Sequence, residues 1–173
     1  MALIDPIRIP AGVAGAVSVD GVADGYEAFA LEAVRGAVAA SGPVMFVLRD
    51  GQRLPQLREA LSFVAPGVPA LELPAWDCLP YDRVSPGADA AARRLDAMAG
   101  MIALARKPHP AFVLTTVNAV LQRMPPAAAV EAQVFSARPG NQVAMDQLVS
   151  RLETGGFERV ATVREGGEYA GRG

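Results

Sequence analysis

Residues 44–48 read Val-Met-Phe-Val-Leu, and this short apolar run decides the fold class. The run is too short for a helix and is rich in β-branched and aromatic residues, so it predicts a buried strand. Residues 26–40 precede it with apolar side chains three and four apart, which predicts an amphipathic helix ending at Ser41-Gly42-Pro43. Residues 52–63 follow as a second predicted helix, with Pro55 in the first turn, where proline is tolerated.

The same alternation continues further along the chain. Short strands are predicted at residues 70–73 and 111–115, and a long helix rich in Ala, Arg, Leu and Met is predicted at 89–105, between them. A short helix at 119–123 follows, capped by Thr116 or Asn118. Repeated alternation of helices and strands favours a parallel α/β sheet.

After Pro126 the pattern changes. Residues 131–137 alternate like a half-exposed strand, residues 142–153 carry apolar side chains at helical spacing, and residues 157–163 predict a further strand. The chain then reaches a glycine turn and the segment 168–173, which resembles the start of another strand.

These changes divide the chain into two predicted domains. Residues 1–126 form an α/β domain with a parallel sheet, and residues 127–173 form the start of a small α+β domain that is truncated.

Composition narrows the classes of function. Of the 173 residues, 51% are hydrophobic and the formal net charge is −2, which is typical of a globular protein without a basic field for nucleic acid. The single cysteine, Cys78, and the single histidine, His109, exclude an internal disulfide and a multi-cysteine zinc site. The pairs Arg93-Arg94 and Arg106-Lys107 are predicted to lie on solvated helix faces. No apolar run approaches the roughly 18–20 residues of a membrane helix, so we expect a cytoplasmic protein without a membrane partner.

A glycine-containing segment before the first helix lies where a phosphate-binding loop would lie. Such a loop needs glycines, a lysine for the phosphate charge and a hydroxyl for magnesium. Here Gly21 and Gly25 lead to Glu27 and Ala28, which stand near the positions of the lysine and the hydroxyl. The segment is therefore predicted to be either an ordinary turn or a degenerate nucleotide loop that does not bind nucleotide.

The proline-rich loop from Leu73 to Pro86 contains the only tryptophan, Trp76, and also Tyr81. An aromatic side chain among prolines can anchor a binding partner at low entropic cost. Alternatively, both aromatic side chains fold inward and fix the loop on the sheet, and this packing role is the interpretation that we favour.

Four blocks in order carry a resemblance to a known family. The sequence is similar to the transcription-repair coupling factors (Mfd) in the blocks 73–86 (LPAWDCLPYDRVSP), 94–95 (RL), 113–123 (VLTTVNAVLQR) and 167–173 (GEYAGRG). The resemblance implies a UvrB-like N-terminal module, with a degenerate RecA-like (P-loop NTPase-like) domain followed by an inserted α+β domain that binds UvrA. UvrB also carries a damage-gripping hairpin, but only residues 87–92 separate Pro86 from Arg93 here, so lesion recognition is not expected.

The resemblance also implies the site residues. Arg172 matches the UvrA-contacting arginine of the family, with Glu168 and Tyr169 beside it on the same segment. In strand geometry, Glu168 and Arg172 would share one face and Tyr169 would point to the other.

The leading hypothesis is a noncatalytic docking module that recruits UvrA to stalled transcription complexes for nucleotide excision repair. ATP, magnesium, DNA translocation and displacement of RNA polymerase would belong to downstream domains of the whole protein, and no cofactor is expected in this part. The alternatives are a small-molecule or nucleotide enzyme on a doubly wound sheet, with its ligand at the carboxyl ends of the strands, and a purely structural domain. The lack of clustered acids, bases and phosphate motifs argues against the enzyme.

Overall fold

A computed structural model describes residues 15–37, 42–78, 83 and 85–171 of the chain. In this part of the chain the elements are α1 (Glu27–Ala37), β1 (Pro43–Leu48), α2 (Leu54–Val64), β2 (Ala70–Leu73), α3 (Ala88–Arg106), β3 (Ala111–Thr116), α4 (Val117–Leu121), α5 (Ala127–Gln133), α6 (Met145–Thr154), β4 (Glu158–Arg159) and β5 (Glu168–Tyr169).

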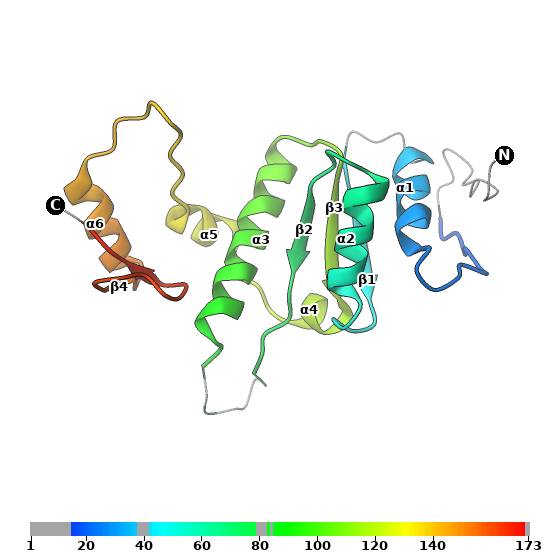
Figure 1. The fold of residues 1–173 in the computed structure, drawn as a ribbon, viewed down its shortest axis with the longest axis horizontal. Helices are drawn as coiled ribbons and strands as arrows, with labels where there is room; N and C mark the ends of the chain where they lie inside the picture. The colour runs from blue at the N-terminus through cyan, green and yellow to red at the C-terminus, as the bar shows by residue number, and fades with distance from the viewer. Residues whose placement is uncertain (1–14, 38–41, 79–82, 84, 172–173) are drawn as a thin grey trace.

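The three longer strands form a parallel sheet in the order β1-β3-β2, which confirms the predicted α/β class. Helices lie on both sides of this sheet, with α1 and α2 on one side and α3 on the other (Figure 1). The connection from β2 through α3 leads to the neighbouring strand β3, whereas the connection from β1 through α2 passes over β3 to reach β2. Such crossovers bury a parallel sheet on both faces.

The central strand β3 divides the core into two apolar layers. Phe112 and Leu114 face α1 and α2, whereas Ala111 and Val113 pack with Leu104 of α3. All six residues of β3 are buried. Their continuous apolar run is typical of a strand covered on both faces.

The first strand is less buried than the sequence predicts. Residues 44–48 were expected to form a buried strand, but β1 is an edge strand on which only alternate side chains pack against the helices. Val44 and Phe46 pack in the core under α1 and α2, whereas Met45 is 53% exposed and Val47 is also exposed. The reason is that α3 contributes its apolar side chains to the β2 and β3 part of the sheet.

The strand predicted at residues 131–137 is wrong, because this region begins with a helix. Pro126 precedes three alanines, which are the strongest helix formers, and α5 covers residues 127–133. Val130 of this helix is buried against Leu73, Ala97 and Met98, whereas residues 134–137 form neither helix nor strand.

The strand predicted at residues 157–163 is shorter than expected. Only Glu158 and Arg159 pair with β5, in parallel register with Glu168 and Tyr169. The next residues turn away because the Glu168 carboxylate accepts hydrogen bonds from the backbone N–H groups of Arg164 (2.7 Å) and Glu165 (3.1 Å).

The predicted helix at residues 142–153 is confirmed as α6, which is followed by Gly155 and Gly156. Gly156 has a φ of 81°, a conformation that favours glycine and that lets the chain leave the helix toward β4. The domain boundary near Pro126 stays a prediction. The first helix after it, α5, packs on α3, and Arg106 of α3 pairs with Glu131 of α5.

Removal of a core aromatic side chain from β3 should destabilise the fold strongly. Phe112 is 0% exposed, so Phe112→Ala should cost about 3–5 kcal/mol of unfolding free energy, measured by urea denaturation. Phe63→Ala is the control, because Phe63 is 83% exposed on α2 and its removal should change stability by less than about 0.5 kcal/mol. Equal costs for the two variants would contradict the assignment of β3 as the centre of the core.

Candidate functional site

The predicted degenerate nucleotide loop leads directly into α1. Gly21 and Gly25 have positive φ values of 75° and 90°, and α1 starts at Glu27. The N–H of Gly25 donates a hydrogen bond to Oε2 of Glu27 at 2.9 Å. Ala28 is buried in the core beside Leu31, so it faces the helix layer and presents no polar group to a ligand.

An arginine that the sequence did not single out completes this site. Arg53, directly before α2, pairs with Oε1 of Glu27 at 2.8 Å and with Oδ1 of Asp24 at 3.2 Å. The negative charge of Glu27 also lies in the first turn of α1, where the helix dipole favours an anion. Arg53 therefore bridges the carboxylates of Asp24 and Glu27 at the start of α1.

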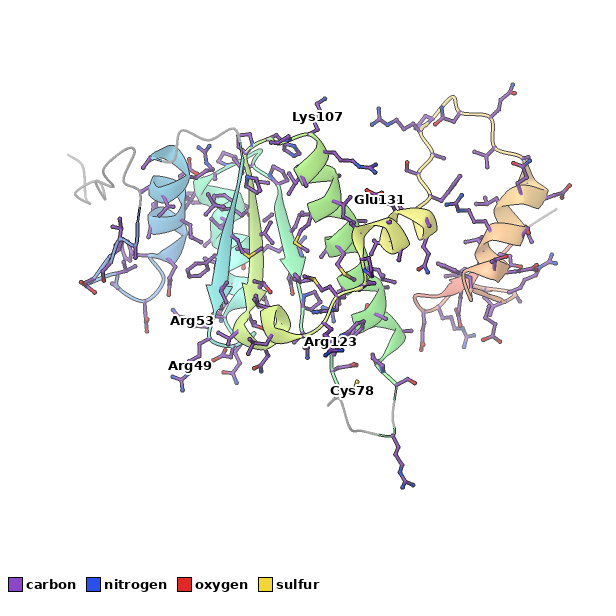
Figure 2. The ribbon with its side chains drawn as sticks, turned by 180° about the vertical axis from the view of Figure 1, so that it is seen from behind. Arg49, Arg53, Cys78, Lys107, Arg123 and Glu131 are labelled. Atoms are coloured by element: carbon purple, nitrogen blue, oxygen red, sulfur yellow. The ribbon has the colours of Figure 1, made fainter. Side chains whose placement is uncertain are left out.

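A cavity of about 270 Å³ adjoins this ion pair at the carboxyl end of β1. Figure 2 shows Arg49 and Arg53 at the same end of the sheet as Arg123, with Lys107 at the opposite end. Parallel sheets bind their ligands at this end. The cavity lining combines two acidic residues, Glu27 and Asp50, and two arginines, Arg49 and Arg53, with apolar residues that include Leu48 and Leu57.

A buried arginine joins the ends of β2 and β3. Arg94 of α3 is 0% exposed, which corrects the prediction that it lies on a solvated face, whereas Arg93 is exposed and pairs with Asp89. Nη1 of Arg94 donates to the carbonyl of Pro74, and Nη2 donates to the carbonyl of Ala119 at 3.3 Å. Burial lowers the pKa of its guanidinium, and Nε has no hydrogen-bond partner among the described residues.

The same arginine holds the proline-rich loop. Its guanidinium lies 5.0 Å from the centre of the Trp76 ring, a cation–π distance, and the backbone N–H of Trp76 donates to Oε1 of Gln122 at 2.8 Å. Trp76 therefore packs on the domain, as the favoured interpretation predicted, while Tyr81 lies outside the described residues. A sequence signal for Arg94 does exist, because Ala90, Arg94, Ala97 and Met98 follow helical spacing and are all buried.

The sequence also contains one cysteine and one histidine as candidate ligands. Cys78 is half-buried, and His109 is exposed, with Nδ1 at 3.0 Å from the carbonyl of Lys107. No group of three His, Cys, Asp or Glu side chains in the described ranges could hold a metal ion. Within those ranges, every helix is too short or too polar to cross a bilayer.

The predicted partner-binding residues lie in and after β5. Glu168 holds the preceding turn through the N–H groups of residues 164 and 165, and Tyr169 is nearly buried. The Tyr169 hydroxyl donates to Oε1 of Glu153 at 2.9 Å, and burial together with this bond raises the pKa of the phenol. Glu168 and Tyr169 therefore have separate partners, while Arg172 lies outside the described residues.

Three curated proteins are similar to most of this chain. They are the transcription-repair-coupling factors of Escherichia coli (strain K12), 29% identical over 133 residues; of Mycobacterium bovis (strain ATCC BAA-935 / AF2122/97), 33% over 149 residues; and of Myxococcus xanthus, 32% over 165 residues. The matches cover 77%, 81% and 91% of the chain, respectively.

The resemblance to transcription-repair-coupling factors is confirmed. The chain spans only 11%, 11% and 13% of the length of these three relatives. No family model matches the chain.

The glycine segment of this chain, which includes Gly21 and Gly25, should not bind nucleotide. The two carboxylates held by Arg53 would repel the phosphates, so calorimetric titration with Mg-ATP should give no saturable heat in the micromolar range. Glu27→Lys puts a lysine near the position that it has in a phosphate-binding loop. Glu32→Lys, which reverses a charge elsewhere on α1, is the control for this variant. Saturable binding that Glu27→Lys leaves unchanged would place a nucleotide site elsewhere.

Replacement of the buried arginine should loosen the Trp76 loop. Arg94→Lys keeps the charge but loses the planar fork that reaches two carbonyls, and should cost about 2–4 kcal/mol of unfolding free energy. Because Trp76 is the only tryptophan, its fluorescence should shift to longer wavelength as water reaches the ring. Arg93→Lys is the matched exposed control, expected to change stability by less than about 0.5 kcal/mol and to leave the spectrum unchanged.

Proposed function

We propose that this chain is a noncatalytic docking module of a transcription-repair-coupling factor, and that it recruits UvrA to stalled transcription complexes for nucleotide excision repair. The similarity to transcription-repair-coupling factors over most of the chain is the observation that carries the proposal. The block Gly167–Gly173 supplies the contact, with Arg172 as the residue that binds UvrA and Glu168 and Tyr169 as its neighbours.

Two features of the structure support a binding role over a catalytic one. The ion pairs of Arg53 occupy the degenerate loop, and the described residues hold no cluster of groups with metal-ligand composition. The parallel sheet with helices on both faces agrees with a degenerate RecA-like domain over residues 1–126, and the later elements with the start of an α+β domain over residues 127–173.

The activities of a whole transcription-repair-coupling factor are assigned to other parts of the protein in this proposal. ATP and magnesium binding, DNA translocation and contact with RNA polymerase would reside outside this chain, in a cytoplasmic protein. A second candidate, a small-molecule site, is favoured only by the cavity at the carboxyl end of β1.

Loss of the arginine contact tests the proposed function. In the full-length protein, Arg172→Ala should weaken UvrA binding about 30-fold, because an arginine anchor often contributes about 2 kcal/mol through paired hydrogen bonds to a carboxylate. Biolayer interferometry with purified UvrA measures the affinity, and thermal melting should show nearly unchanged stability.

Arg164→Ala is the control, because Arg164 is an exposed charge on the preceding turn. Equal UvrA affinities for the wild type and both variants would show that Arg172 is not the anchor. A full-length protein without measurable affinity for UvrA would overturn the proposed function.

A further inference from the structure

The helix α5 is fixed to the main domain. Val130 of α5 is buried in the apolar core against α3, and Glu131 pairs with Arg106 of α3. Residues 134–144 follow without helix or strand and lead to the α6 unit, which we define as residues 145–171 with α6, β4 and β5. Figure 1 shows the α6 unit at the end of the molecule that is remote from α1. The joint between the two parts therefore lies after α5.

The α6 unit shares no apolar core with the main domain in the part of the chain that the structure describes. The three apolar clusters of these residues contain nothing after Val130, and none of the residues of α6 is fully buried. The turn at Gly166 comes close to Ala92 of α3, but neither residue has a side chain large enough to interlock with the other. Parts of a chain without a large apolar interface are expected to move relative to one another unless polar contacts hold them.

Arg151 of α6 supplies such contacts at the end of α5. Its Nη2 donates to the carbonyls of Ala132 (3.1 Å) and Val134 (3.0 Å), and its guanidinium lies 5.6 Å from the centre of the Phe135 ring. A cation beside the last carbonyls of a helix is also favoured by the helix dipole. Among the described residues, every side-chain hydrogen bond between the α6 unit and the chain before Phe135 comes from this arginine.

Other side chains hold the α6 unit together internally. Glu153 of α6 accepts a hydrogen bond from the hydroxyl of Tyr169 in β5 at 2.9 Å. Glu168 accepts hydrogen bonds from the backbone N–H groups of the preceding turn. Since these contacts do not involve Arg151, its removal leaves α6 and β5 joined to each other.

We propose that Arg151 is a latch that fixes the orientation of the α6 unit on the main domain, and that residues 134–144 are the hinge about which the unit turns when the latch opens. Opening breaks two hydrogen bonds and one aromatic contact, while the core of the main domain and the internal contacts of the α6 unit stay intact. The latch thereby also sets where β5 lies relative to the sheet. This orientation does not depend on which partner binds the chain.

The distance between the two parts tests the proposal in the full-length protein. Spin labels are attached through a ketone-bearing amino acid introduced at Ala103 of α3 and at Gln147 of α6, which are both exposed, and double electron–electron resonance measures the distances between them. Arg151→Ala should raise the population of a second, separated arrangement about fivefold, because two hydrogen bonds from a charged donor are lost. Arg151→Lys should raise this population less, because it keeps the charge but loses the planar guanidinium.

Arg164→Ala is the control, because Arg164 is an exposed arginine of the same unit, and it should leave the distances unchanged. Amide hydrogen exchange of residues 145–154 should match the wild type in every variant, since the backbone hydrogen bonds of α6 do not depend on the latch. Distances that Arg151→Ala leaves unchanged would overturn the proposal. Lost protection of α6 in Arg151→Ala would overturn it as well, because Arg151 would then support the helix itself and not its orientation.

Discussion

The backbone of β3 pairs with β1 on one side and with β2 on the other, and this double pairing determines the rest of the main domain. Both faces of β3 are then covered, because this central strand is apolar on both sides. Phe112 and Leu114 pack against α1 and α2, whereas Ala111 and Val113 pack against α3. The carboxyl ends of all three strands consequently meet at one edge, where the loop before α1 and the Trp76 loop also lie.

Arg94 connects the segments that follow β2 and β3 at this edge of the sheet, and none of the described carboxylates pairs with it. A buried guanidinium is costly unless its donors find acceptors, and here the carbonyls of Pro74 and Ala119 and the ring of Trp76 take that role. The hydroxyl of Thr115 adds a further link, donating to the carbonyl of Leu73 at 3.0 Å. The edge that binds ligands in many parallel sheets is thus partly filled by internal contacts.

The loop before α1 is held by ion pairs within the main domain. Arg53 pairs with both Glu27 and Asp24, so one cation faces two carboxylates and the loop before α1 keeps an excess of negative charge.

The sequence by itself determined the local elements of the main domain. Residues 26–40 carry apolar side chains at helical spacing, residues 111–115 form a short apolar run, and proline and glycine mark the ends of these segments. Tertiary structure alone decided which side chains those elements bury. The alternation at residues 131–137 suited a strand, but the alanines before Val130 and the contact of Val130 with α3 favour the helix α5, which ends at Gln133, and residues 134–137 form neither helix nor strand. Likewise, helical spacing places Arg94 on the same face of α3 as Ala90, Ala97 and Met98, but only the tertiary structure brings the carbonyls and the aromatic ring that accommodate its buried charge.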